Sequence, residues 1–155
     1  MRVGALRPYV LALLADAYGT VGQGAAGLSV LAEALTAVQS TGERYYEAEL
    51  YRLQGALLLQ GAVPDALQAE RCFQHALEVA RGQQARSWEL RAALSLSRLW
   101  QRQGQHTAAY ALLAAVYHWF TEGFDTPDLQ EAGTLLEVLR GDSIPTGGVQ
   151  NDLDL

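Results

Sequence analysis

The chain contains no lysine and a single cysteine among its 155 residues. Because Cys72 has no partner for an internal disulfide, nothing indicates an oxidising compartment, and we expect a cytoplasmic protein. The absence of lysine excludes a phosphate-binding loop that ends in a glycine-lysine pair, and with it an ATPase site of that type. All eleven basic residues are arginines.

Positive charge and long apolar runs are also scarce. Seventeen acidic residues outnumber eleven basic ones, and the resulting net charge of -6 argues against binding to nucleic acid phosphates. The apolar run that begins at Val10 is interrupted by Asp16, and it is too short for a secretory signal or a membrane span. We therefore expect neither a nucleic-acid partner nor a membrane partner.

Three stretches of the sequence share one helix-pair template. In each stretch a helix ends near glycine, and a small residue and large apolar residues follow at fixed offsets in a second helix. The stretches are about 39 and then about 43 residues apart, in the range of helix-pair repeats that stack into solenoids. The template residues are Leu14, Tyr18, Gly22, Gly27, Leu31, Ala34 and Leu35, then Leu53, Leu57, Gly61, Ala69, Phe73, Ala76 and Leu77, then Leu96, Trp100, Gly104, Ala109, Leu113, Val116 and Tyr117.

Helical periodicity and the positions of glycine and proline predict seven helices. We predict an all-α fold, a right-handed α-α superhelix of three antiparallel helix pairs plus a C-terminal capping helix, over residues 1–140. Gly27, Ala69 and Ala109 are expected where paired helices cross most closely, because small side chains let the backbones approach. Residues 141–155 have little apolar content and are expected to form a disordered tail. The predicted helices run from Gly4 to Gly19, Ala25 to Val38, Glu43 to Gln60, Pro64 to Ala80, Gln84 to Gln103, Thr107 to Thr121 and Pro127 to Arg140.

The template spacing resembles the tetratricopeptide repeat, whose repeats of about 34 residues are shorter. Three denser strings lie at residues 42–52 (GERYYEAELYR), 85–91 (ARSWELR) and 117–126 (YHWFTEGFDT). They resemble the C-terminal repeats of large bacterial signalling proteins that carry an AAA-type or STAND-type ATPase, often with a nucleotide cyclase or transcriptional-regulator domain. The resemblance extends from about Gly42 to Leu139 and implies a structural repeat module, without naming its ligand.

No set of residues predicts catalysis, a metal or a cofactor. His75, His106 and His118 fall on three separate elements, with no nucleophile motif, so we interpret them as surface or partly packed side chains. Cys72 and His75 lie three residues apart on one helical face, as half of a zinc site would, but two further ligands are not evident. We therefore interpret Cys72 as a packed thiol and expect no enzyme activity.

A concave groove along the first helix of each pair is the candidate binding site. Arg91, Arg98 and Arg102 are spaced by seven and then four residues, which aligns their guanidinium groups to hold a carboxylate or a phosphate. The simpler alternative is that these arginines are solvated or paired with Glu89 and other neighbours. The candidate groove residues are Tyr9, Asp16, Tyr51, Leu58, Arg91, Leu94, Arg98, Gln101 and Arg102.

Two classes of function fit these sequence features. The first is a protein-interaction or sensor module of a signalling ATPase or regulator, whose partner is a protein, a peptide or the upstream domains of a longer chain. The second is a stand-alone adaptor that forms a homodimer through open solenoid faces, and a small-molecule effector-binding domain is a third alternative. The first class predicts an apolar face on the first helix that preceding repeats cover, whereas the second predicts that a second copy covers it.

Overall fold

The computed structural model describes residues 3–42 and 44–143, and all regular secondary structure within them is helical. The all-α prediction is therefore confirmed. Pro127 begins the last helix, as the sequence predicts. The helices of the described residues are α1 (Val3–Thr20), α2 (Gly24–Thr41), α3 (Glu47–Gln60), α4 (Ala66–Gly82), α5 (Arg86–Arg102), α6 (His106–Tyr117) and α7 (Pro127–Ser143).

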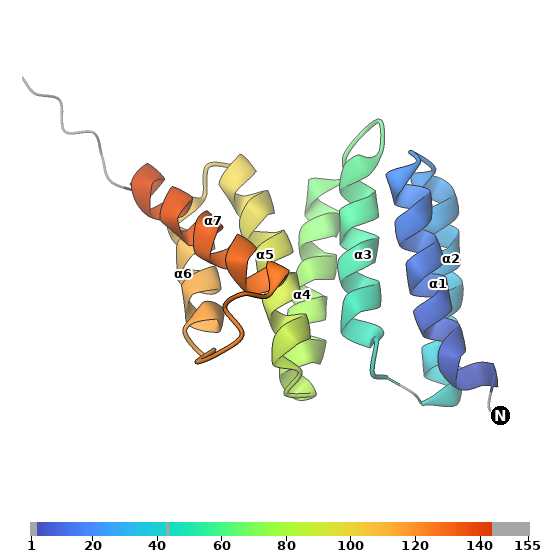
Figure 1. Cartoon of the computed structure of the whole chain (residues 1–155). Coiled ribbons are helices and arrows are strands. Elements are labelled where there is room, and N and C mark those ends of the chain that lie inside the picture. Colours follow the sequence, from blue (N-terminus) through green and yellow to red (C-terminus); the bar gives the residue numbers. More distant parts are fainter. Residues whose placement is uncertain (1–2, 43, 144–155) are drawn as a thin grey trace, which may run out of the picture.

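Local sequence explains several helix ends. The backbones of Gly22 and Gly104 have φ of 77°, a left-handed conformation that glycine adopts without steric cost and that reverses the chain inside a helix pair. Before α4, the side chain of Asp65 accepts a hydrogen bond of 3.1 Å from the backbone N–H of Gln68 and so caps the helix. These residues separate the paired helices by short turns (Figure 1).

Four predicted helix ends were wrong by about one turn, and one of them is the end of the second helix, which lies at Thr41 and not at Val38. The third helix begins at Glu47, because Tyr45 and Tyr46 form a turn in which their rings pack edge to face at 4.9 Å. The predicted start, Glu43, lies outside the described residues. The sixth helix ends at Tyr117 and not at Thr121, because the chain tightens into a turn in which the N–H of Phe120 bonds to the carbonyl of Tyr117 at 3.1 Å.

The C-terminal helix is longer than predicted. It was expected to end at Arg140, but α7 continues to Ser143. Residues 141–143 therefore belong to a helix and not to the predicted tail. The remainder of that tail, residues 144–155, lies outside the described residues.

The helices form two layers (Figure 1). Within the described residues each helix contacts the next along the chain, and α1, α3, α5 and α7 also contact one another in series. The helices α1 to α6 alternate in direction, so α1, α3 and α5 start at the same end of the molecule, and α7 crosses α5 obliquely (Figure 1). Side chains near the starts of α1, α3 and α5 are thereby brought onto one surface.

Small residues lie where paired helices cross, as predicted. A Cβ atom on Gly27 would lie 2.8 Å from Cδ1 of Leu57 and 3.1 Å from the carbonyl oxygen of Ala15. Ala69 and Ala109 are completely buried. A fourth close approach, which the repeat template does not predict, places Gly55 of α3 against the ring of Phe73 on α4. Close packing of this kind leaves no room for a methyl group at Gly27 or Gly55.

One template position differs in exposure between repeats. Leu53 and Leu96 are 6% and 1% exposed, whereas their counterpart Leu14 on α1 is 42% exposed. Leu14 belongs to an apolar stripe on α1, continued by Val10, Ala17 and, just beyond the helix, Val21, all of which are exposed. Among the described residues, α3 packs against the helix pair α1 and α2, but no helix packs on the outer face of α1 in the same way. The first repeat therefore exposes the apolar face that the later repeats bury.

Candidate binding surface

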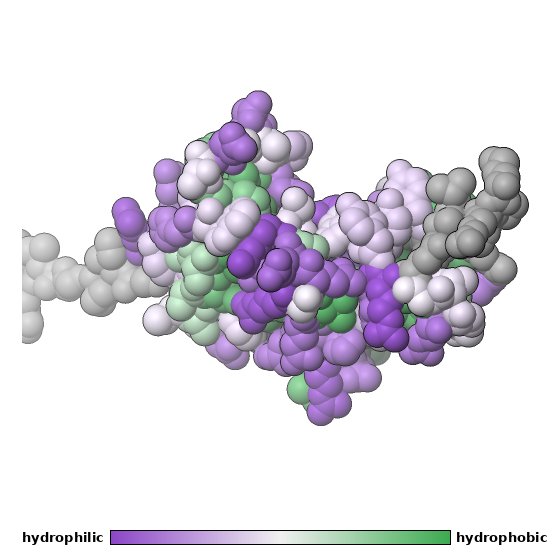
Figure 2. All heavy atoms as spheres, turned by 90° about the horizontal axis from the view of Figure 1, so that it is seen from below, coloured by the Kyte–Doolittle hydropathy of each residue, from purple (hydrophilic) through white to green (hydrophobic). Residues whose placement is uncertain are grey.

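Three of the predicted groove residues meet in one pocket between α1, α3 and α5. Tyr9 and Asp16 come from α1 and Arg91 from α5, and they line a cavity of about 160 Å³. From the end at which these helices begin, strongly hydrophilic residues cover the middle of the surface, and residues of intermediate hydropathy lie beside them (Figure 2). The remaining lining residues are Ala12, Leu13, Tyr46, Glu49, Arg52, Leu53 and Trp88.

Other predicted groove residues lie elsewhere. Leu94 is buried in the core, so its assignment to an open groove was wrong. Its neighbours on the same stripe, Arg91 and Arg98, pair with residues of α7, which shows that α7 covers this part of α5. A helical pattern can align Leu94 with the arginines but cannot show which later helix lies over them.

The other candidates do not form a single groove with that pocket. Tyr51 is partly buried, and its ring packs edge to face on His75 with centroids 4.2 Å apart. Leu58 lines a separate pocket beside α2. Arg98 and Gln101 line a third pocket with residues of α7, and Arg102 is exposed. The predicted continuous groove is thus divided into separate surfaces.

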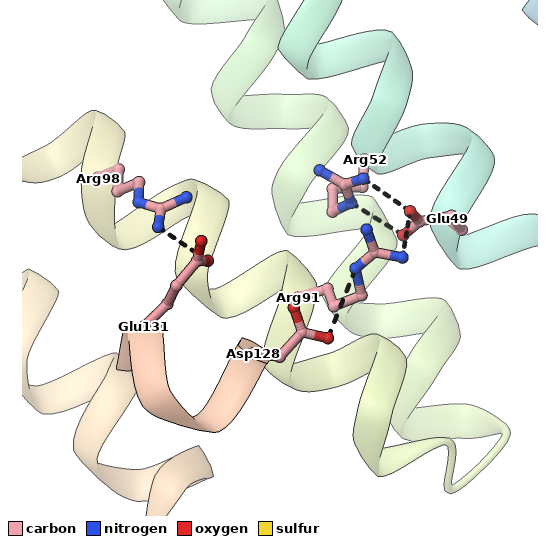
Figure 3. Close-up of polar contacts among 6 residues, drawn as sticks. All are labelled: Glu49, Arg52, Arg91, Arg98, Asp128 and Glu131. Carbon is pink, nitrogen blue, oxygen red and sulfur yellow. Dashed lines mark hydrogen bonds and ion pairs between the residues drawn. The ribbon is translucent and has the colours of Figure 1, made fainter. Parts of the chain in front are cut away.

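An ion-pair network joins α3, α5 and α7 (Figure 3). The carboxylate of Glu49 accepts hydrogen bonds from Nε and Nη2 of Arg52 at 2.8 and 2.6 Å, and Nη1 of Arg91 lies 2.8 Å from the same carboxylate. On its other side, Nε of Arg91 lies 3.7 Å from Asp128 of α7. Arg91 is therefore held between two carboxylates.

The arginine stripe is largely paired within the chain. Nη2 of Arg98 donates to Glu131 of α7 at 3.0 Å, so two of the three stripe arginines contact carboxylates (Figure 3). Glu89, which the sequence offered as a partner, instead contacts Arg81 and Arg86, each at 3.0 Å. These contacts favour the alternative of paired arginines over an open anion-binding stripe.

Arg52 keeps its charge although its side chain is only 15% exposed. Burial lowers its pKa, but the hydrogen bonds and attraction of Glu49 raise it more, with smaller contributions from Asp16 and Asp128, so the net pKa is raised. The pair is a bidentate contact between residues three apart on α3. That spacing, visible in the sequence, could have predicted the pair, whereas the third member, Arg91, is visible only in the structure.

Aromatic rings from three elements lie around the pocket. The rings of Tyr9 and Tyr46 are tilted by 37° with centroids 5.2 Å apart, and those of Tyr46 and Trp88 are tilted by 57° at 6.0 Å. The guanidinium of Arg91 lies 5.8 Å from the Trp88 ring centroid. Tyr46 and Trp88 lie within the strings that carry the family resemblance but were not predicted as site residues, because their encounter depends on packing between repeats.

The histidines and the cysteine form no metal cluster in the part of the chain that the structure describes, where no three His, Cys, Asp or Glu side chains gather suitably. The thiol of Cys72 donates to Oε1 of Gln54 at 3.6 Å, and burial raises its pKa. No helix among the described residues combines the length and hydropathy required to cross a membrane. The sequence matches no protein-family model and no curated protein.

Proposed function

We propose that this chain is a protein-interaction scaffold, a tetratricopeptide-like solenoid that serves as the C-terminal repeat module of a bacterial signalling ATPase or regulator. Two features support the proposal. The helices contact one another in series, as stacked helix pairs do, and three sequence strings resemble the repeats of such signalling proteins. The proposal assigns the chain binding and positioning, with no catalytic step.

The exposure of Leu14 is the observation that carries this proposal. The equivalent leucines, Leu53 and Leu96, are buried by the stacking of one repeat on the next. A repeat array buries such a face only when another surface covers it. We assign that cover to a preceding helix pair of the same longer polypeptide, because its packing would be of the kind that α1 and α2 already provide for α3.

Sedimentation of the chain across a concentration series is the first test. The proposal predicts a monomer in which the amides of α1 exchange with solvent faster than those of α3 and α5, because one face of α1 lacks cover. A dimer that disappears in a Val10→Ser/Leu14→Ser variant would replace the proposal with the self-associating adaptor. Val63→Ser/Leu67→Ser, which alters two exposed apolar residues in the α3–α4 connection and on α4, is the matched control.

A longer chain supplies the second test. A copy of residues 47–85, which contains α3, α4 and the following turn, is fused ahead of α1 so that it can cover the open face. The fusion should slow amide exchange throughout α1, and Val10→Ser/Leu14→Ser should remove the effect. If α1 in the original chain is already as protected as α3 and neither change alters it, the face needs no cover and the proposal fails.

A further inference from the structure

The pocket between α1, α3 and α5 combines aromatic rings, an apolar floor and an excess of negative charge. Tyr9, Tyr46 and Trp88 supply the rings, and Leu13 and Leu53 supply apolar surface. We call this site the aromatic pocket, defined by these five residues together with Ala12, Asp16, Glu49, Arg52 and Arg91.

The charges favour a cation as the occupant. Among the side chains that the structure describes, the pocket and its immediate contacts contain the carboxylates of Asp16, Glu49 and Asp128 but only two guanidiniums, those of Arg52 and Arg91. Both guanidiniums are already within contact distance of a carboxylate. The side chain of Asp16 makes no hydrogen bond or contact ion pair with any residue of the described chain, and it acts on Arg52 only through longer-range attraction.

The size of the cavity suits a single side-chain group. Its volume of about 160 Å³ is close to that of an engineered apolar cavity of about 150 Å³ that admits a benzene molecule. A single guanidinium or ammonium group with part of its aliphatic stem fits such a volume, and the apolar lining of Leu13 and Leu53 suits the stem.

We propose that the aromatic pocket binds a basic side chain, arginine or lysine, of the protein partner. The inference rests on the proposed interaction function and adds the chemistry that the partner presents. Cations are attracted to the faces of aromatic rings within about 6 Å. Arg91 already lies 5.8 Å from the Trp88 ring centroid, so the rings of Tyr9 and Tyr46 and the carboxylate of Asp16 supply the attraction for a further cation. The net charge of -6 attracts basic partners at longer range.

Capped amino acids test this pocket without a protein partner. The probes are the N-acetyl amides of arginine, lysine, glutamine and glutamate, titrated at millimolar concentration into the isotope-labelled chain. The indole N–H signal of Trp88, assigned with a Trp88→Phe variant, reports binding by nuclear magnetic resonance. The arginine and lysine probes should shift this signal saturably, and less so at high salt. The glutamine and glutamate probes should leave it unchanged.

Two substitutions connect the response to the pocket. Asp16→Asn should weaken arginine-probe binding about tenfold, which corresponds to about 1.4 kcal/mol, and Tyr9→Leu should weaken it several-fold. Both residues are exposed, so the fold should be retained. Glu137→Gln removes an exposed carboxylate on α7, outside the pocket, and should leave probe binding unchanged.

Three outcomes would overturn the inference. They are a Trp88 signal that responds to the glutamate probe in preference to the arginine probe, no response to any probe, and equal effects of Asp16→Asn and Glu137→Gln. None of them changes the sedimentation and exchange results for Val10 and Leu14, so the scaffold proposal can stand when this inference fails. Conversely, if the probes bind but the amides of α1 are as protected from exchange as those of α3, the pocket inference stands and the proposal that a preceding helix pair covers α1 fails.

Discussion

The same substitution, glycine to alanine, should change stability in opposite directions at two helical positions. Gly55 lies inside α3 and Gly133 inside α7, so alanine gains about 1 kcal/mol of helix propensity at either position. At Gly55 the new Cβ would lie 2.6 Å from Cε1 and 2.9 Å from Cδ1 of Phe73, and 3.0 Å from the carbonyl oxygen of Ala69. At Gly133 the nearest atom is Oη of Tyr117 at 3.4 Å, an ordinary contact.

The cost at Gly55 exceeds the gain. Carbon atoms pack best at about 3.5 to 4.0 Å, so α3 and α4 would have to separate by most of an ångström. Phe73 is buried and cannot swing away, and the carbonyl of Ala69 is fixed in α4. Overpacking of this kind costs about 1 to 3 kcal/mol, which leaves Gly55→Ala less stable by about 1 kcal/mol, whereas Gly133→Ala is more stable by about 1 kcal/mol.

Urea unfolding followed by circular dichroism measures both changes. The urea concentration at the unfolding midpoint should fall for Gly55→Ala and rise for Gly133→Ala. The slope of the unfolding free energy against urea concentration should stay unchanged in both variants. Each kcal/mol corresponds to about 2 to 4 °C in the thermal midpoint of a chain of this size. Equal stabilisation at both positions would refute the close crossing of α3 and α4, because propensity alone would then account for the result.

Three further predictions concern ion pairs and the thiol. Glu49→Gln should lower the free energy of unfolding by about 2 kcal/mol, since the largely covered Arg52, whose side chain is 15% exposed, then loses its carboxylate partner, and urea unfolding at neutral pH measures the loss. Glu131→Ala, which breaks the exposed pair with Arg98, should cost less than about 1 kcal/mol in the same assay; a larger loss than for Glu49→Gln would contradict the assignment of the buried pair. Burial raises the pKa of Cys72 above its ordinary value of 9.0, so above pH 9.0 the native thiol stays protonated while the unfolded thiol ionises. The stability that this pKa difference contributes is therefore full below pH 9.0 and declines as the pH rises above it. Iodoacetamide should accordingly alkylate the native thiol more slowly than the thiol in urea, and equal rates would exclude the burial effect.

Features that depend on neighbouring residues in the sequence were predictable. The glycine at Gly104 and the proline at Pro127 mark helix boundaries because each acts on its own backbone. Gly27, Ala69 and Ala109 were identified as crossing points because the template repeats their positions relative to the large apolar residues. Such features require no knowledge of which repeat contacts which.

The candidate site was less predictable because it depends on contacts between repeats. The alignment of Arg91, Leu94 and Arg98 on α5 was a sound helical inference, but Leu94 is buried in the core and α7 supplies Asp128 and Glu131 to the two arginines. The contact of Arg91 with Glu49 joins residues in two different repeats. The two residues are not three or four positions apart on one helix, so no helical spacing in the sequence predicts this pair.

Equivalent positions of the three repeats can be compared, because some carry the same residue in every repeat and others do not. Positions 14, 53 and 96 all carry leucine, which is buried at positions 53 and 96 and exposed at position 14. The corresponding positions 9, 48 and 91 carry tyrosine, alanine and arginine, and the first and last of these line the aromatic pocket. Stacking alone would accept the same apolar or neutral residue at each of these positions. The contacts of Arg91 with Glu49 and Asp128 account for the arginine within the fold, whereas the proposed binding of a basic side chain would account for Tyr9.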